Sequence, residues 1–598
     1  MAAAVIVLAE GAFAVTGWPQ QALAACALLI APGLAVLALL PRELRRLPVA
    51  VPVVPIAGFA VTTILLVSLP AVGLALDDLT IRAGLGTVVL VGLIGSRYVD
   101  DGRPVAHHRG AFPTLLGLAG VTGLGVALQA LVIGGTPLPG EDWGEYLLYA
   151  QEIEREQALL IDNPYWMLGG DWFPLDPGVP AVYGAFLTLA DVPATALLHG
   201  IWVFAVLAIL AVFVLAAALW GATAGLVAAG LYAVAPMTLN MLAWHGLPNV
   251  AALSLIPVAL FAAGVALRGE ETRRHAAVLG CGLVALAAVH RFSFVLGLLA
   301  VVVSLASGLV RRPGPIARFA GWTVVAAVVA GTAVAIDLVR RNSALGGTQG
   351  YEAFLPTKVA WELVARDLTW PVAIAGLVAI LAVLVVPPFL SDPSRFVLAG
   401  LAVSILALTY AWIAHVPTGY NRAAYFAPLL LAPTLGLLSS KVPPIVAIAA
   451  AAALVGVTAA EARDLARDYR GFYGHVNAAS LRGLGFVNQR AGRNDAVVTD
   501  QCWGFLSTWL LQRPVLAALD PALTLPKREV APATRARRIL VGRNGARLAR
   551  RAGIRYALVD PQCTYQTGKR YPRPRNGKLV YASTRLFVYD LERPRGSG

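Results

Sequence analysis

The chain has 598 residues, of which 58% are hydrophobic and only 13% are charged, and its mean hydropathy is +0.72. In water-soluble chains, about a quarter of all residues are charged. This composition therefore excludes an ordinary soluble enzyme. The formal net charge of +14 is not spread evenly along the chain.

Apolar runs of membrane length recur along the chain and are separated by short arginine-bearing turns. A helix needs about 20 such residues to cross a bilayer. The sequence predicts about fifteen spans, at 2–16, 20–40, 51–75, 81–97, 112–134, 195–219, 222–240, 248–268, 276–290, 292–310, 317–337, 370–390, 395–415, 422–439 and 443–460. The first run is interpreted as a retained helix, and 180–190 as a re-entrant or interfacial segment.

The basic turns set the predicted topology. Placing all of them in the cytoplasm satisfies the positive-inside rule, which puts the N-terminus inside and the C-terminus outside. We expect extra N-terminal spans at 1–111, a helical core at 112–460, and an extracytoplasmic domain at 461–598. Two further outer segments, 135–194 and 338–369, belong to the core. The second is either a mobile gate or a simple connector.

The C-terminal segment reads as a small α/β domain. Short β-rich runs, namely DAVVTD, RPVLAAL, RRILVG, RYALVD and RLFVYDL, alternate with the helical patterns GFLSTWLLQ and NGARLARRAG. Cys502 and Cys563 both fall here, on the side where disulfides are permitted, and form a candidate bridge. The segment is strongly basic, which fits either an anionic envelope partner or a solvated face; nucleic acid is not expected.

The first outer segment opens with PGEDWGEYLLYA at 139–150, which carries Glu141, Asp142 and Glu145 directly after a span. From Asp142 onward, polar and apolar residues recur at helical spacing. We therefore predict a helix along the membrane surface, with Glu145 and the later acids facing water. Glu141 and Asp142 are expected at the mouth of the bundle. Trp143 and Trp172 suit either an aromatic belt or stacking on a sugar.

An acidic pair after an early span, then Tyr146 and Ala150 at spacings of four, then a Pro-rich aromatic stretch, resembles the GT-C superfamily of membrane glycosyltransferases. The resemblance covers 112–460, with the C-terminal domain as an accessory. It implies a polyprenyl-phosphate sugar donor and a catalytic base in this acidic segment, with Asp142 as the first choice and Glu141 as the second. The chain departs from the simplest pattern, because four spans precede the helix that leads into the acidic segment.

Three other predicted outer turns carry polar residues, although the positive-inside rule does not predict such residues on the outer side. They hold His245; His290 with Arg291; and Tyr420, Asn421 and Arg422. Ionisable groups at membrane depth are costly and usually face a cavity or a partner. Arginine can hold a departing lipid phosphate in two hydrogen bonds. Arg422 resembles the arginine that faces the lipid phosphate in several GT-C families, and Arg291 with His290 is a second candidate for that role.

These patterns predict transfer of a sugar to an envelope glycan or glycolipid on the outer face of a bacterial plasma membrane. The Ala-, Val- and Arg-rich composition fits a high-GC bacterium, and similar actinobacterial enzymes use decaprenyl-phosphate arabinofuranose or mannose in cell-wall biogenesis. No cofactor is required by the sequence. A divalent metal on Asp142 with Asp171 or Asp176 is the less favoured alternative.

Three other functions compete with this hypothesis. A transporter or flippase for lipid-linked glycans would show internal repeats and midplane charges. A ligase that uses a lipid-pyrophosphate donor would have its large outer loop near the C-terminus. A non-catalytic scaffold would leave Arg291 and Arg422 without a role. The sequence has no Walker A motif, which argues against ATP-driven transport, and no WWDYG-like signature of oligosaccharyltransferases.

Overall fold

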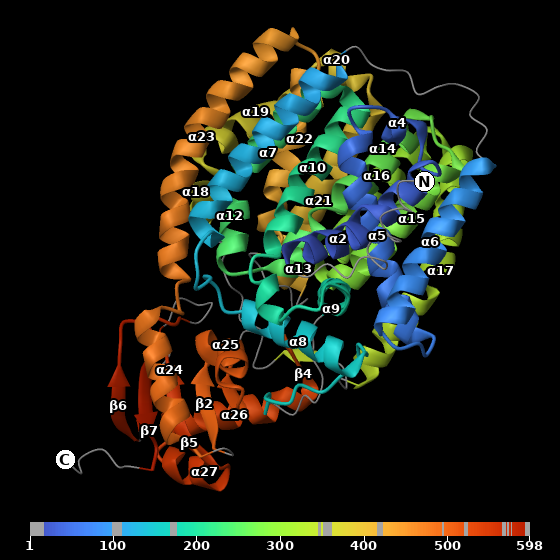
Figure 1. Cartoon of the computed structure of the whole chain (residues 1–598). Coiled ribbons are helices and arrows are strands. Elements are labelled where there is room, and N and C mark those ends of the chain that lie inside the picture. The colour runs from blue at the N-terminus through green and yellow to red at the C-terminus, as the bar shows by residue number, and fades with distance from the viewer. Residues whose placement is uncertain are drawn as a thin grey trace.

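The computed structural model describes residues 17–98, 110–167, 176–344, 348–350, 361–414, 422–492, 495–519, 524–564, 570, 573–575 and 577–592. Long helices form a bundle, and a small α/β domain lies at one end of it (Figure 1). The predicted first span, 2–16, lies outside the described residues.

The bundle is built from helices in chain order. The N-terminal helices are α2 (Trp18–Leu29), α3 (Ala31–Leu37), α4 (Arg42–Arg45), α5 (Ala50–Ala71), α6 (Asp78–Arg97) and α7 (Ala111–Ile133). The predicted first outer segment forms α8 (Trp143–Glu156), α9 (Gly178–Ala190) and the 3-10 turn η1 (Ala194–Leu197). The central helices are α10 (Ile201–Trp220), α11 (Ala222–Ala233), α12 (Pro236–Ala243), α13 (Leu247–Ala252), α14 (Ile256–Arg268), α15 (Arg273–Val289), α16 (Arg291–Arg311) and α17 (Pro313–Ala344).

The last part of the bundle ends in a long helix that reaches the α/β domain. Its elements are α18 (Trp361–Leu368), α19 (Trp370–Val385), α20 (Pro387–Leu390), η2 (Pro393–Arg395), α21 (Phe396–Thr409), η3 (Ala411–Ala414), η4 (Ala424–Phe426), α22 (Ala427–Ser439) and α23 (Pro444–Phe472). Helix α23 continues through position 461, where the sequence suggested a boundary.

Large apolar side chains cover the outside of the bundle. Val328 and Val329 on α17 are 59% and 81% exposed, and Ile445 on α23 is 80% exposed. A soluble protein rarely shows so much contiguous apolar surface, whereas lipid tails are as apolar as these side chains. The centre is filled with protein, because 94% of the apolar window of α13–α14 is buried, against 17% for α17. The chain is a multi-pass membrane protein.

The predicted count of about fifteen spans is not confirmed. The described residues contain nine helices that are long and apolar enough to cross a bilayer, or ten if α11 and α12, which meet at 48°, form one broken span. Pro236 begins α12 and cannot donate a backbone hydrogen bond, which explains the break. Four other predicted spans are occupied by α15, α19, α21 and α22, which have only 13 to 17 residues.

The α/β domain contains one five-stranded sheet. Its elements are α24 (Ala478–Arg490), β2 (Ala496–Asp500), α25 (Gln501–Leu511), β3 (Val515–Ala518), α26 (Lys527–Val541), α27 (Gly545–Arg551), β5 (Ile554–Val559), β6 (Lys578–Ala582) and β7 (Phe587–Asp590). The strand order is β3-β2-β5-β7-β6, and β3, β2 and β5 are parallel. A short strand after α17, β1 (Thr348–Gly350), pairs antiparallel with β4 (Thr524–Pro526) and ties the predicted second outer segment to this domain.

Most of the predicted strands are present, with one error. The run RRILVG forms the end of helix α26 rather than a strand, because Ala533, Ala536 and Ile539 recur at helical spacing and are fully buried. Strand β6 was not predicted. Cys502 and Cys563 form the disulfide that the sequence suggested.

Helix α8 lies between the bundle and the α/β domain, as Figure 1 shows. It packs against α9 on one side and α25 on the other. The prediction that its acidic side faces water is wrong for Glu145 and Glu152, which are 3% and 2% exposed, whereas Glu156 at the end of the helix is exposed as predicted. The helical spacing of the acids was visible in the sequence, but the domain that covers them comes from residues more than 300 positions later.

A buried arginine fixes α8 to the bundle. The guanidinium of Arg341 on α17 pairs with Asp337 at 2.7 Å and donates to the Tyr149 hydroxyl and the Leu159 carbonyl. Removing one member of a buried ion pair leaves the other charge uncompensated and costs about 3–5 kcal/mol.

We therefore expect Arg341→Met to lower the thermal unfolding midpoint of the detergent-solubilised protein by several degrees, measured by intrinsic fluorescence. The matched control is Arg340→Met, because Arg340 is exposed and, among the described residues, makes one hydrogen bond, to the Ala71 carbonyl at 3.3 Å. Equal midpoints for both variants would contradict the anchoring role of Arg341.

Candidate active site

The acidic turn before α8 is held tightly by two other parts of the bundle. Gly140 has a φ of +92°, and a Cβ atom there would lie 2.7 Å from the backbone carbon of Trp244. Its N–H donates to the Tyr473 carbonyl at 2.9 Å. Only glycine fits this conformation and this close approach. The turn therefore fixes the next two residues, Glu141 and Asp142, where α8 begins.

The two neighbouring acids face different surroundings. Asp142 occupies the N-cap position of α8, but its side chain makes no capping hydrogen bond. Burial raises the pKa of Asp142 to about 7, and the positive charge of Arg422 opposes the rise. Burial also raises the pKa of Glu141 well above its usual value, and there the charges of Asp142 and of Asp500 in the α/β domain add to the rise.

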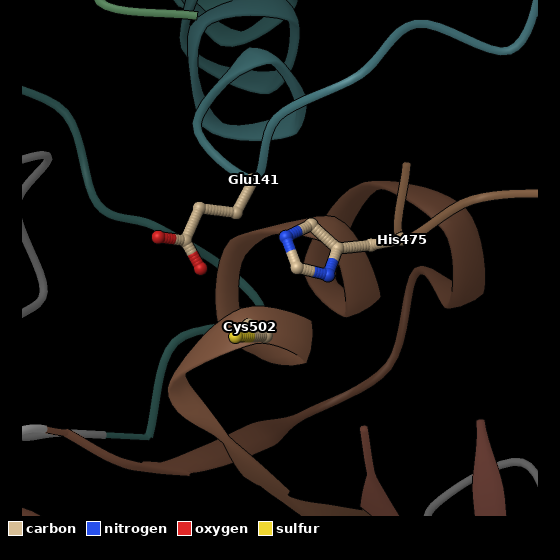
Figure 2. A group of neighbouring side chains, drawn as sticks. All are labelled: Glu141, His475 and Cys502. Carbon is tan, nitrogen blue, oxygen red and sulfur yellow. The ribbon is translucent and has the colours of Figure 1, made fainter. Parts of the chain in front are cut away.

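Glu141 points toward the α/β domain. Figure 2 shows its side chain beside His475 and Cys502, and one potential ligand atom from each lies within 4.8 Å of the others. Cys502 is bonded to Cys563, so its sulfur is no thiolate and cannot act as a strong metal ligand. This group therefore offers only two good donors to a metal.

A buried polar network lies behind Glu141, at the carboxyl ends of the parallel strands β2 and β5. The Asp560 carboxylate contacts His475 at 2.8 Å and Arg585 at 2.9 Å, and the Asp560 N–H donates to Asp500 at 2.6 Å. Burial lowers the pKa of His475, which favours the neutral ring. The network thus places the Arg585 guanidinium beside the carboxylates of Asp500 and Asp560, next to the acidic turn.

Arg422 lies on the bundle side of the site, just before η4. This turn is held between two aromatic contacts, because Tyr425 lies 6.2 Å from Trp244 and Phe426 lies 6.3 Å from Phe292, measured between ring centroids. Arg422 itself is exposed. Its positive charge opposes the rise that burial causes in the pKa of Asp142, so the two predicted residues lie within electrostatic reach of each other.

His290 and Arg291 lie at the start of α16. The His290 ring bonds the Ser293 hydroxyl at 2.7 Å and caps this helix. Burial, followed by the charges of Arg422 and Arg291, lowers the pKa of His290. His290 is therefore a neutral group beside two arginines, rather than a third cation.

Asp176 holds Arg291 in place. Its two carboxylate oxygens accept from the Arg291 Nε at 2.5 Å and from the Arg291 backbone N–H at 2.9 Å. Burial raises the pKa of Asp176, and Arg291 opposes the rise. Because both oxygens already face Arg291, they are poorly placed to share a metal with Asp142. The other predicted metal partner, Asp171, lies outside the described residues.

His245 lies at the α12–α13 turn, where it adopts a φ of +65°. Its ring lies 6.4 Å from that of Tyr146 on α8 and is 3% exposed. Trp143 is 4% exposed, so its ring is part of the packing beneath the site rather than an open stacking surface. The predicted substrate contacts Tyr420, Asn421 and Trp172 lie outside the described residues.

Sequence reasoning missed the residues that support the site from a distance. Asp176 was considered only as a less favoured metal ligand, and Arg585 was not singled out. A usable signal existed for Asp500 and Asp560, because each directly ends or follows a buried strand in the runs VVTD and ALVD. The carboxyl ends of parallel strands meet at one sheet edge, where polar sites form.

The arrangement was compared with known proteins. The structure of the arabinofuranosyltransferase AftD from Mycobacteria matches 79% of this chain with a TM-score of 0.51 and 18% sequence identity. The chain has a GT-C-like fold. This GT-C-like chain spans about 40% of the length of the AftD chain.

Two structures of ArnT from Cupriavidus metallidurans are also similar to the GT-C-like chain. One is bound to undecaprenyl phosphate and matches with a TM-score of 0.43; the other, in the apo state, matches with 0.47. Both are 14% identical in sequence. The matches cover 81% and 79% of this chain, and 98% and 97% of the respective ArnT chains. No protein-family model and no curated protein matches the sequence.

Proposed function

We propose that this protein is a glycosyltransferase that moves a sugar from a polyprenyl-phosphate donor to a glycan or glycolipid of the cell envelope. One observation carries the proposal: the charge of Arg422 acts on the partly buried carboxylate of Asp142 where α8, the α12–α13 turn and η4 meet. A base beside an anion-binding cation is what transfer from a lipid phosphate requires. The GT-C-like fold supports this assignment.

In the proposed reaction, an acceptor hydroxyl attacks the anomeric carbon of the donor sugar. The new bond joins the acceptor oxygen to that carbon, and the bond from the carbon to the phosphate oxygen breaks. Asp142 takes the hydroxyl proton. The electron pair leaves on the lipid phosphate, whose charge Arg422 stabilises. Arg291, oriented by Asp176, supplies a second positive charge near the same end of the bundle.

The raised pKa of Asp142 predicts the pH dependence of transfer. A base acts only when ionised, and the pKa of Asp142 is about 7. We expect kcat/KM to fall about tenfold for each pH unit below about 7, and to level off above it. Initial rates between pH 5 and 9 measure this limb. A flat profile through pH 7 would contradict Asp142 as the base.

We propose arabinofuranose as the first candidate sugar and mannose as the second. The arabinofuranosyltransferase activity named for AftD supports this order. The test incubates purified protein in nanodiscs with a panel of radiolabelled polyprenyl-phosphate sugars and envelope glycan acceptors. We expect labelled product from one pentose or hexose donor. Absence of turnover with every donor would overturn the proposal.

We assign the α/β domain and the acidic turn to the outer side of the membrane and the N-terminus to the cytoplasm. The basic turns between spans support this orientation. The disulfide between Cys502 and Cys563 supports it independently, because disulfides persist in oxidising compartments. On this assignment, the helical core carries the chemistry and the α/β domain acts as an accessory that supports Glu141.

A further inference from the structure

A cavity of about 640 Å³ opens beside the acidic turn, between α12, α18, η4 and the end of α23. This volume lies in the range of pockets that hold a small ligand. His290 and Arg291 are not among its lining residues, so the cavity is distinct from the start of α16. No residue of this cavity was singled out by the sequence patterns.

The cavity is connected to the acidic turn through its walls. Tyr473 lines it, and the carbonyl of the same residue accepts the Gly140 hydrogen bond that fixes the turn. Ala424 and Tyr425 line it two and three residues after Arg422. A ligand in the cavity would therefore lie near the acidic turn and near the backbone that follows Arg422, although neither Asp142 nor Arg422 lines the cavity.

The lining combines flat aromatic rings with paired polar groups. Four rings face the cavity, all of them at or near the α/β-domain end of the bundle, and they belong to Tyr425, Tyr469, Phe472 and Tyr473. Phe472 is 59% exposed, which leaves its ring accessible. Rings offer an apolar face against which the C–H face of a sugar can stack.

The charges of the lining cancel. Arg366 and Arg467 are offset by Asp367 and Asp468. Arg366 contacts Asp367 at 3.0 Å, so this pair presents donors and acceptors together without a net field. Such a surface suits a neutral ligand with many hydroxyl groups. It suits a phosphate poorly, because a phosphate needs excess positive charge. An apolar polyprenyl chain would fit the rings, but it would cut the four charged side chains of the lining off from water.

Asn240 on α12 adds an independent observation. Its Nδ2 donates to Asp367 at 2.9 Å. The residue is 7% exposed, yet among the described residues its Oδ1 atom has no hydrogen-bond partner. A buried amide oxygen without a partner is costly, and an incoming hydroxyl would satisfy it.

We propose that this cavity binds the carbohydrate acceptor, as a neutral oligosaccharide whose end reaches Asp142. The inference rests on the proposed function, because the cavity is assigned to the acceptor of that same transfer. The donor phosphate then binds at Arg422, and the two substrates approach the base from different sides.

The test measures binding and transfer separately. Neutral arabinofuranosyl and mannosyl tetrasaccharides are titrated against the full-length protein in nanodiscs by saturation-transfer NMR, without any donor. We expect Phe472→Ala to weaken binding about tenfold and Asn240→Leu to do the same. The matched control is Phe112→Ala, because Phe112 on α7 is also exposed, at 71%, and does not line the cavity. The control should bind like the wild type.

The transfer arm distinguishes failure of this inference from failure of the proposed function. With donor present, both cavity variants should raise the acceptor KM while the slow transfer of donor sugar to water keeps the wild-type rate. Equal acceptor affinity in the wild type and both variants would overturn the inference, even if the donor is consumed. A wild type that binds the oligosaccharide but turns over no donor would overturn the proposed reaction instead.

Discussion

Asp142→Asn reduces kcat about 10²–10⁴-fold in the expected result, the range that removal of a general base produces. The amide has the same shape as the carboxylate, and Asp142 makes no capping bond that the change would break. Folding and donor binding should therefore remain intact. The measurement is the initial rate of sugar transfer at saturating donor, together with the thermal unfolding midpoint as a check on folding. The acidic limb of the pH profile should disappear.

The matched control is Glu141→Gln, the same change one residue earlier. Glu141 lies beside His475, as Figure 2 shows, and feels the charges of the α/β-domain network, so it is placed to support the turn rather than to meet the acceptor. We expect its rate to fall less than about tenfold. If Glu141→Gln lost more activity than Asp142→Asn, the two acids would exchange roles.

Arg422→Ala has the second-largest expected effect, a loss of about 10²–10³-fold in kcat/KM for the donor. The guanidinium stabilises charge that appears on the lipid phosphate as the sugar leaves, and alanine supplies none. Arg422→Lys should recover part of the rate, because the charge returns without the two-pronged geometry. Steady-state rates at varied donor concentration measure both variants.

The pH profile of Arg422→Ala gives a second, independent test. Arg422 opposes the rise in the pKa of Asp142, so its removal should raise that pKa above about 7. The acidic limb of the pH profile then moves to higher pH. Arg538→Ala, which changes an exposed arginine of α26, serves as the control and should leave both rate and profile unchanged. An unshifted limb in Arg422→Ala would show that the two residues do not interact.

The helices could be predicted because bilayer-length apolar runs and basic turns are local signals. The same signals overcounted the spans, because α15, α19, α21 and α22 are as apolar as spans but shorter than 18 residues. In RRILVG, a local run of β-branched and apolar residues was outweighed by the helical period of Ala533, Ala536 and Ile539. Tertiary burial decided between the two patterns.

Part of the candidate site could be predicted for the same reason. His245, His290 and Arg422 were grouped because polar residues at interhelical turns are costly without a role. The structure places His245 beside Tyr146 of α8 and His290 within reach of the charge of Arg422. Nothing local indicated the burial of Glu145, because that burial depends on α25, which is distant in sequence. The pairing of Arg291 with Asp176 could not be predicted either, because no local sequence pattern links two residues that are 115 positions apart.

The fate of the donor phosphate distinguishes sugar transfer from transport of the intact lipid-linked sugar. The purified protein is reconstituted in vesicles with a polyprenyl-phosphate sugar that carries one label in the sugar and another in the phosphate, and a neutral oligosaccharide is added outside. We expect the sugar label to move to the oligosaccharide while the phosphate label stays in polyprenyl monophosphate, mole for mole. In Asp142→Asn both products should form far more slowly. Passage of both labels together across the vesicle membrane, or transfer only from a pyrophosphate-linked donor, would contradict the proposed reaction.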